Sequence, residues 1–315
     1  MNSNAAADFL VTGGAGFIGS HLVERLIRDG HRVRVLDDLS SGKLENLHAV
    51  KDRLDFVHGN AALAADTARA VAGVRGVFHL AAISSVTVSI EQPLRNQQAG
   101  EVATLTVLDA ARRAGVRRVV LSSSASVYGN SENAANAESL PSQPLSFYAL
   151  SKLTGENYAR IFSALHPGFD TVSLRYFNVF GPRQDPANPY SGVISIFLRC
   201  LKTGHAPTIF GDGRQTRDFV EVSNIVEANL LAMQAAQPLR GEVYNVGTGE
   251  SVSLLEVWQR LGELAGTSLQ PAFAAPRAGD IRHSRAAIEK IRAQLGYAVR
   301  VSWQDGLQKL WDSLK

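Results

Sequence analysis

Short apolar runs alternate with segments of helical character through the first half of the chain. The apolar runs have the length of buried strands, and several of them end in glycine or a polar residue. Strands that alternate with helices in this way favour a parallel sheet with helices on both faces. The pattern predicts strands at 8–14, 32–38, 54–60, 76–82 and 117–124, and helices at 21–30, 68–74 and 101–115.

The alternation changes in the second half of the chain. A polar, proline-containing segment at 133–146 is expected to be a loop that precedes a helix from about Tyr148. Beyond about residue 170 the pattern loosens, and glycine and proline become more frequent, as at 180–192. Irregular regions of this kind often carry substrate specificity. We therefore expect two domains, 1–170 and 171–315, with some segments of the second returning to the first.

Composition is that of an ordinary globular protein. The chain has 315 residues, 45% of them hydrophobic and 19% charged, and its formal net charge of +3 comes without a block of Lys or Arg, which argues against nucleic acid as a partner. The one cysteine, Cys200, suits a reducing compartment. The first residues, MNSNAAAD, lack the features of a signal peptide, and no apolar stretch approaches the ~18 residues that span a bilayer. We expect a cytoplasmic protein that binds no membrane.

A glycine-rich turn joins the first predicted strand to the first predicted helix, in the stretch VTGGAGFIGSHLVERL (11–26). Gly14, Gly16 and Gly19 have the G-x-G-x-x-G spacing of dinucleotide-binding turns, in which the backbone approaches a pyrophosphate at a helix N-terminus. Such turns also occur without nucleotides. Here, however, Asp37 ends the next strand, where a carboxylate accepts hydrogen bonds from ribose hydroxyls and repels a 2′-phosphate. The motif predicts NAD as the cofactor.

The stretch SSSASVYG (122–129) has three interpretations by itself: a turn, a nucleophile, or a row of hydroxyls for a bound molecule. Tyr148 and Lys152, four residues apart, would lie on one face of a helix. A neighbouring ammonium and a cationic nicotinamide would lower the pKa of the phenol from its ordinary value of about 10. Tyr148 could then exchange a proton with a substrate hydroxyl while hydride moves to or from the cofactor. This combination favours the third interpretation, with Ser124 holding the reacting hydroxyl beside Tyr148.

The chain resembles the extended short-chain dehydrogenase/reductase family, and within it the nucleotide-sugar epimerases. The resemblance rests on the segments above together with HLAA, RYFNVFGPRQDP, IFGDGRQTRDFVEVSNI, YNVGTGESVSLLEV and PRAGDIRHS, which span nearly the whole chain. It implies an α/β fold with a Rossmann-type doubly wound parallel sheet that binds NAD, and a smaller C-terminal α/β domain for a UDP-sugar substrate. It also implies a homodimer formed through two helices of each subunit, here 101–115 and the helix that carries Tyr148.

The resemblance also implies roles for individual residues. Ser124, Tyr148 and Lys152 match the catalytic trio. The residues that match cofactor contacts are Gly13, Gly14, Gly16, Phe17, Ile18, Gly19, Asp37, Asn60, Ala61, Leu80, Ala81, Ala82, Ser122, Tyr148, Lys152 and Tyr176. Those that match substrate contacts are Ser84, Ser124, Ser126, Tyr148, Asn178, Val193, Thr208, Phe210, Arg217, Arg277, Asp280 and Ser284.

Three of these substrate positions have a physical argument of their own. Arg217 and Arg277 match phosphate-binding positions, and guanidinium groups suit a diphosphate, although a surface salt bridge is the commoner role of an arginine. Ser284 matches a position at which a bulky side chain narrows the sugar pocket of glucose-specific relatives. A small residue there leaves room for an N-acetyl group. Alternatively, Ser284 is only the N-cap of a following helix.

The residues after Ser124 narrow the chemistry that the resemblance implies. Related dehydratases and decarboxylases carry carboxylates there, whereas this chain has Ala125 and Ser126. Reversible oxidation at C4 remains, without a metal, since the histidines show no metal-ligand spacing. We expect an NAD-dependent 4-epimerase of UDP-N-acetylglucosamine and UDP-N-acetylgalactosamine, with UDP-glucose and UDP-galactose as further substrates. The alternatives are a UDP-glucuronate 4-epimerase, another nucleotide-sugar 4-reductase, and a non-catalytic NAD-binding regulator.

Overall fold

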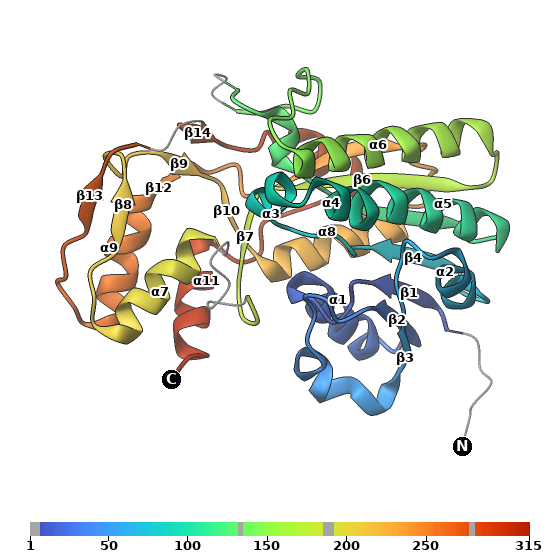
Figure 1. Ribbon diagram of the computed structural model, residues 1–315, viewed down its shortest axis with the longest axis horizontal. Coiled ribbons are helices and arrows are strands. Elements are labelled where there is room, and N and C mark those ends of the chain that lie inside the picture. Colours follow the sequence, from blue (N-terminus) through green and yellow to red (C-terminus); the bar gives the residue numbers. More distant parts are fainter. Residues whose placement is uncertain (1–6, 132–134, 185–191, 277–280) are drawn as a thin grey trace. The chain divides into compact units, whose positions relative to one another are not determined.

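The computed structural model describes residues 7–131, 135–184, 192–276 and 281–315. These residues include a seven-stranded sheet with the strand order β11-β6-β5-β4-β1-β2-β3 (Figure 1). The pairs β1–β2, β1–β4, β2–β3 and β4–β5 are parallel, as the sequence predicts. The strands are β1 (Phe9–Thr12), β2 (Val33–Asp37), β3 (Leu54–His58), β4 (Gly76–His79), β5 (Arg118–Ser124), β6 (Asp170–Tyr176) and β11 (Glu242–Val246).

The sheet winds in two directions from β1. The chain runs from β1 to β2 and β3 on one side, and then returns to β4 on the other side of β1. In doubly wound sheets, ligands bind at the carboxyl ends of the strands where the winding reverses. Those ends are followed here by Gly13 after β1 and Leu80 after β4. This Rossmann-type arrangement confirms the predicted fold class.

Helices cover both faces of the sheet, because alternate residues of a strand point to opposite sides. On one face, Leu10 and Val119 belong to a buried cluster with residues of α2, α5 and α6. On the other face, Arg25 of α1 pairs with Glu227 of α8 at 3.2 Å. The helices of this part are α1 (Phe17–Arg28), α2 (Ala64–Val71), α3 (Val86–Glu91), α4 (Pro93–Gln97), α5 (Ala103–Arg113), α6 (Phe147–Leu165) and α8 (Val222–Gln234).

Three helical segments differ from the expectation. The helix predicted from 101 is preceded by helical turns from Pro93 onward, through α4 and η2 (Gln98–Val102). α3 forms in a stretch rich in β-branched residues because Ser85 caps it, its hydroxyl accepting from the Val88 N–H at 3.1 Å. A 3₁₀ helix, η1 (Leu44–Arg53), follows β2, and only Leu47 and Val50 of it are buried. Two buried positions are too few to give the sequence a recognisable helical pattern of apolar residues.

The chain divides into two compact units. The first unit extends to Val127 and also holds Pro144–Arg175 and Val226–Tyr244; the second holds Tyr128–Gln143, Tyr176–Ile225 and Asn245–Lys315. The core of the second unit contains Phe197 and Trp258, whose rings meet edge to face at 5.3 Å. Its helices are α7 (Val193–Thr203), α9 (Leu254–Ala265), α10 (Glu289–Leu295) and α11 (Trp303–Asp312), and η3 (Ala125–Tyr128) spans the boundary between the units.

Short strands complete the second unit. The pairs β7–β10 and β8–β13 are parallel, and β9 lies between β12 and β14. These strands are β7 (Asn178–Phe180), β8 (Thr208–Phe210), β9 (Thr216–Arg217), β10 (Phe219–Glu221), β12 (Val252–Ser253), β13 (Ala272–Ala274) and β14 (His283–Ser284). In the described part of the chain, no helix is long and apolar enough to cross a membrane.

Candidate active site

The glycine-rich turn between β1 and α1 forms a cradle that side chains would fill. Gly13 has φ +69°, and a Cβ on it would lie 2.7 Å from the Ala81 backbone nitrogen. A Cβ on Gly19 would lie 2.1 Å from the Gly13 carbonyl oxygen. Gly16, the N-cap of α1, offers no side-chain acceptor to the first helical turn, which begins with Phe17 and Ile18. Backbone N–H groups at such a terminus suit a pyrophosphate, so the turn fits the predicted dinucleotide.

Asp37 lies at the end of β2, beside this turn. Its carboxylate accepts hydrogen bonds from the backbone N–H groups of Ala15 and Leu39, both at 2.9 Å and each to a different oxygen. Both oxygens therefore retain a lone pair for a ribose hydroxyl. Burial raises the pKa of Asp37 above its ordinary value, and the two backbone hydrogen bonds oppose that rise.

The other predicted cofactor positions follow β3 and β4. Asn60 is exposed, donates to the Asp38 carboxylate at 3.3 Å and accepts from the Ala62 N–H at 2.8 Å. The backbone N–H of Ala81 donates to the Thr12 hydroxyl at 3.3 Å, which joins the end of β4 to the end of β1. The structure thus brings Leu80 and Ala81 against the glycine turn, with Ala61 buried after β3, while Ala82 follows them in the chain.

The predicted catalytic trio lies at the carboxyl end of β5. Ser146 caps α6, its hydroxyl accepting from the Ala149 N–H at 3.1 Å, which starts the helix beside Tyr148. Ser124, the last residue of β5, forms a side-chain hydrogen bond with Tyr148. The Lys152 ammonium donates to the carbonyl oxygen of Ser122 at 2.8 Å and to its hydroxyl at 3.2 Å. The same ammonium lies 5.8 Å from the centre of the Tyr148 ring.

Burial is the main cause of the pKa shifts of Tyr148 and Lys152. Burial raises the pKa of Tyr148 above its ordinary value, and the hydrogen bond with Ser124 lowers it only in part. The lower pKa that the sequence predicts for Tyr148 relies on the ammonium together with a cationic nicotinamide; from the residues of the chain alone, desolvation of the phenolate dominates. Burial also lowers the pKa of Lys152 to about 8, against the Glu156 carboxylate, which raises it.

Ser126 borders the trio. The Ser126 backbone N–H donates to the Ser124 hydroxyl oxygen at 3.2 Å, which fixes the orientation of Ser124. The Ser126 hydroxyl is buried and has no hydrogen-bond partner among the described residues, as a group reserved for a ligand would be. Ser84, in contrast, is exposed in the loop before α3.

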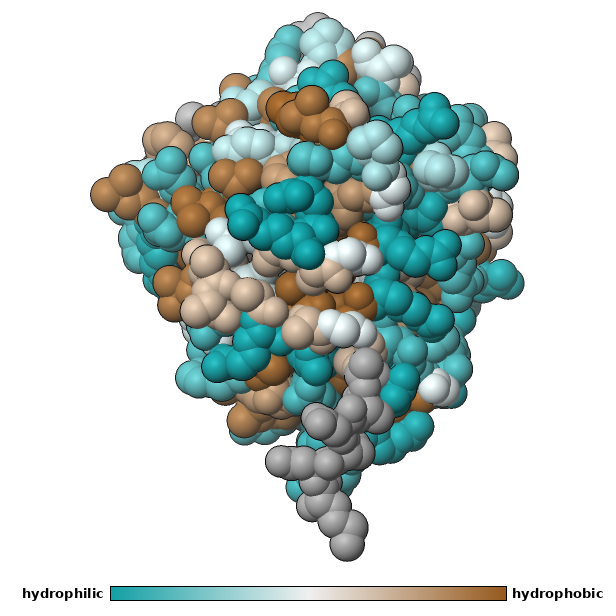
Figure 2. Space-filling model, turned by 90° about the vertical axis from the view of Figure 1, so that its right-hand side faces the viewer, coloured by the Kyte–Doolittle hydropathy of each residue, from teal (hydrophilic) through white to brown (hydrophobic). Residues whose placement is uncertain are grey.

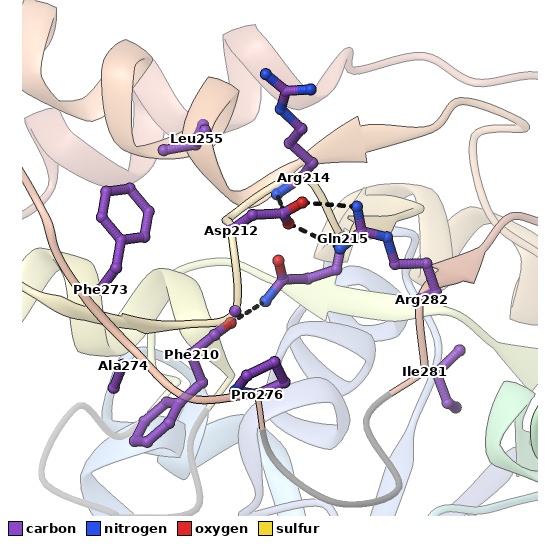
Figure 3. A pocket seen from close by; sticks show the side chains of 11 residues that line it. Phe210, Asp212, Arg214, Gln215, Leu255, Phe273, Ala274, Pro276, Ile281 and Arg282 are labelled. Atoms are coloured by element: carbon purple, nitrogen blue, oxygen red, sulfur yellow. Dashed lines mark hydrogen bonds and ion pairs between the residues drawn. The ribbon is translucent and has the colours of Figure 1, made fainter.

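The second unit holds a pocket of about 720 Å³ (Figure 3). Phe210, Phe273 and Pro276 give it apolar walls, and Gln215 donates to the Phe210 carbonyl oxygen at 2.7 Å. The amide oxygen of Gln215 is buried without a partner in the described part of the chain. Of the predicted residues that the structure describes, only Phe210 lines this pocket; the lining residues missed from the sequence are Gly211, Asp212, Arg214, Gln215, Leu255, Phe273, Ala274, Pro276, Ile281 and Arg282.

One rim of the pocket is an exposed ion pair. Arg282 donates through both terminal nitrogens to the two carboxylate oxygens of Asp212, at 2.7 and 2.8 Å. The Arg214 backbone N–H adds a third bond to the same carboxylate at 2.9 Å. These bonds hold the pKa of Asp212 well below its ordinary value. Figure 3 shows this pair opposite the aromatic ring of Phe273.

Arg217 and Ser284 are brought side by side by the pairing of β9 with β14. Asp218 fixes this arrangement, since its buried carboxylate accepts from the backbone N–H groups of Thr248 and Ala286 at 2.7 and 3.1 Å. The alternative in which Ser284 caps a helix is wrong, because Ser284 pairs as a strand residue and the next helix, α10, has Ile288 as its cap.

The remaining predicted residues of the second unit are placed by short elements. The Asn178 backbone N–H donates to the carbonyl oxygen of Asp218 at 2.9 Å. Asn178 therefore lies next to the residue that follows Arg217 and β9. Tyr176 ends β6 and is buried, Thr208 begins β8, and Val193 begins α7. Arg277 and Asp280 lie outside the described residues.

Comparison with known proteins gives the family of the chain. Residues 9–247 match the NAD dependent epimerase/dehydratase family. A UDP-glucose 4-epimerase of Mycolicibacterium smegmatis is 41% identical over 305 residues, which cover 95% of this chain and 96% of the relative. The structure of a UDP-N-acetylglucosamine 4-epimerase from Methanobrevibacter ruminantium, in complex with UDP-N-acetylmuramic acid, has a TM-score of 0.92 at 35% identity and covers 98% of both chains. The UDP-glucose 4-epimerase of Thermus thermophilus, in complex with NAD, has a TM-score of 0.86 at 36% identity and covers 97% of this chain and 98% of that one.

The doubly wound sheet, the glycine cradle and the likeness to structures that hold NAD define an NAD-dependent enzyme with a Rossmann-type domain. The chain belongs to the NAD dependent epimerase/dehydratase family, and it is an epimerase. The resemblance to extended short-chain dehydrogenases/reductases and the prediction of NAD are thereby confirmed.

Proposed function

We propose that the chain is a 4-epimerase of UDP-sugars, with UDP-N-acetylglucosamine and UDP-N-acetylgalactosamine as its principal pair and UDP-glucose and UDP-galactose as further substrates. The observation that carries the proposal is the cluster of Ser124, Tyr148 and Lys152 at the end of β5. Neither Ala125 nor Ser126, which follow in the chain, offers the carboxylate that elimination or decarboxylation would need. Reversible hydride transfer at C4, without elimination or decarboxylation, requires only this cluster and a cofactor.

The proposed steps follow from the chemistry of the three side chains. NAD, when held by the glycine turn and Asp37, supplies a reversible acceptor for the hydride of C4. Tyr148 acts as the phenolate, which Lys152 and a bound oxidised cofactor favour, and it accepts the proton of the C4 hydroxyl. Ser124 holds the oxygen of that hydroxyl by a hydrogen bond, and a 4-keto sugar results. Lys152 stabilises the phenolate by its charge. After the sugar turns over, the Tyr148 hydroxyl would return the proton to the C4 oxygen as the keto sugar is reduced on its other face.

The second unit supplies features that suit the UDP-sugar. We assign the pocket of Phe210 and Phe273 to the nucleotide base, because aromatic walls and the buried amide of Gln215 match a planar base with polar edges. Arg217, beside Ser284, would contact the diphosphate, and the short side chain of Ser284 leaves room for an N-acetyl group. In this assignment residues 1–170 mainly bind NAD and residues 171–315 mainly bind the substrate.

We further infer a homodimer that forms through α5 and α6. These helices expose large apolar side chains, with Leu105 42%, Leu150 43%, Ile161 48% and Leu165 68% exposed. In Figure 2 the face that carries α5 and α6 turns toward the left, and hydrophobic residues are more frequent in that half of the view. An apolar helical face of this kind is typical of a subunit interface. The reducing compartment that Cys200 suits is the cytoplasm.

A proton NMR time course tests the function directly. Purified protein is mixed with UDP-N-acetylglucosamine without added cofactor, and an anomeric signal of UDP-N-acetylgalactosamine should grow until it reaches equilibrium. Conversion of UDP-glucose or UDP-glucuronate alone would overturn the assignment of the substrate. Absence of conversion of all three, even with added NAD, would overturn the proposed function. As a control, Tyr148→Phe should abolish turnover and leave UDP-sugar binding nearly intact; unchanged turnover would contradict the role of Tyr148.

A further inference from the structure

A buried ion pair lies one helical turn beyond Lys152. Glu156 of α6 accepts hydrogen bonds from the Arg175 guanidinium at 2.7 and 2.8 Å, one to each carboxylate oxygen, and another from the Ser123 hydroxyl. Both side chains of the pair are 5% exposed. A buried ion pair is not by itself stabilising relative to apolar residues of similar volume. None of the proposed chemical steps uses these two residues, so their presence needs another explanation.

A small polar cavity connects this pair with the catalytic lysine. It measures about 10 Å³, and its lining includes Lys152, Glu156, His79, Thr104, Ser151 and Ser173. A cavity of about 10–15 Å³ with polar walls is the size that holds a single water molecule. The Ser173 hydroxyl is buried and has no partner among the described residues. Lys152 donates two hydrogen bonds to Ser122, which leaves its third N–H for the cavity.

We propose that Glu156 is a positioning residue for Lys152. Its carboxylate, held by Arg175, keeps the Lys152 ammonium in place and charged through one water molecule in this cavity. The inference rests on the proposed function, because the charge of Lys152 acts on the substrate through Tyr148. Glu156 and Lys152 are four residues apart on α6 and line the same cavity, so the carboxylate acts at short range in a site with little solvent to screen it.

The other charged or titratable groups around Lys152 do not replace this carboxylate. His79, at the end of β4, is neutral, since burial lowers its pKa to about 3. Its two ring nitrogens form hydrogen bonds with the hydroxyl groups of Thr12 and Thr104. Burial raises the pKa of Tyr148, on the same helix as Lys152, which opposes a negative charge on the phenol. Arg175, on β6, is positive and is balanced by Glu156 itself. Glu156 is the one acid among the described residues that line the cavity.

The test is the pH dependence of kcat/KM for Glu156→Gln, which keeps the shape of the side chain and removes its charge. Loss of the charge should lower the pKa of Lys152 further, so that the alkaline limb of the profile moves down by about one pH unit and activity above that limb falls about tenfold. The matched control is Asp170→Asn, which removes the negative charge from another largely buried pair, Arg118–Asp170, at 2.6 Å. This control should leave the limb where it is. An unmoved limb in Glu156→Gln would overturn the inference.

Two further measurements keep the inference falsifiable. If Glu156→Gln fails to fold, Ser173→Val fills the cavity while keeping the ion pair, and it should move the alkaline limb in the same direction; an unmoved limb would count against the water. The second measurement needs no turnover. The titration of the Lys152 ammonium, followed by carbon NMR of labelled lysine and identified by the signal that Lys152→Met lacks, should lie at lower pH in Glu156→Gln than in the unaltered chain. That shift in a protein that converts no UDP-sugar would support the network and overturn the proposed function. Turnover with no shift would do the reverse.

Discussion

Replacing Lys152 with methionine should abolish epimerisation and yet make the first unit more stable at neutral pH. Burial lowers the pKa of Lys152 from 10.5 to about 8, a difference of about 2.5 pH units. At ~1.36 kcal/mol per unit, the charged ammonium disfavours folding by about 3 kcal/mol at pH 7. Methionine has a similar length and no charge, but it loses the hydrogen bonds to the Ser122 carbonyl and hydroxyl oxygens. Each lost hydrogen bond offsets about 1 kcal/mol of this stabilisation, so the free energy of unfolding at pH 7 should rise by about 1 kcal/mol.

The pH dependence of this effect has a definite sign. The folded pKa lies below the unfolded pKa, so between pH 8 and 10.5 the unfolded chain binds the proton that the folded chain has released. The stability of the unaltered chain must therefore rise, relative to Lys152→Met, as the pH increases through this window. Between pH 7 and pH 10 the relative gain is about 2–3 kcal/mol. Taking the difference between the two proteins cancels the titration of all other groups.

The assay is urea unfolding of both proteins at a series of pH values, without NAD, followed by far-ultraviolet circular dichroism. Tryptophan fluorescence is unsuitable because Trp258, Trp303 and Trp311 all lie in the second unit, whereas Lys152 lies in the first. A difference in unfolding free energy that does not change between pH 7 and pH 10 would refute the reasoning. So would a difference that changes in the opposite direction.

Three further substitutions test the cofactor and sugar sites. Ser284→Tyr should lower kcat/KM for UDP-N-acetylglucosamine at least tenfold relative to UDP-glucose, while Ser284→Ala leaves the ratio unchanged; equal losses for both sugars in Ser284→Tyr would contradict the assignment. Asp37→Ala should weaken NAD binding by ~10- to 100-fold, as expected for a charge-assisted bond of about 1.5–3 kcal/mol, and should weaken NADP binding less, as calorimetric titration would measure. Gly19→Ala places a Cβ 2.1 Å from the Gly13 carbonyl oxygen. It should destabilise the chain by about 1–3 kcal/mol and weaken NAD binding, whereas Gly155→Ala, whose Cβ would meet its nearest neighbour at 3.4 Å, should be tolerated; equal melting temperatures for the two variants would contradict the cradle.

The features that the sequence predicts correctly are those encoded by neighbouring residues. The glycine turn is a single stretch of chain between one strand and one helix, and its spacing carries its geometry. Tyr148 and Lys152 share a helix face because they are four residues apart. The parallel sheet follows from the alternation of strands and helices, which the chain repeats several times.

What could not be predicted depends on residues that are distant in sequence. Asp212 and Arg282 at the rim of the pocket are 70 positions apart, and no local pattern links them. Glu156 and Arg175 pair across a helix and a strand, and each looks like a surface charge in its own segment. Ser284 has the side chain of a helix cap, but its pairing with β9 makes it a strand residue. In each case the tertiary partner overrides the local preference.

The central claim is that this chain oxidises and reduces C4 of a UDP-sugar through a hydride that never leaves the site. The most direct measurement is proton NMR of UDP-N-acetylglucosamine incubated with the purified protein in D₂O. UDP-N-acetylgalactosamine should accumulate to equilibrium with a full proton signal at C4, because the hydride returns to the carbon it left. Product that carries deuterium at C4 would contradict this account, since it would require removal of the C4 hydrogen as a proton that exchanges with solvent.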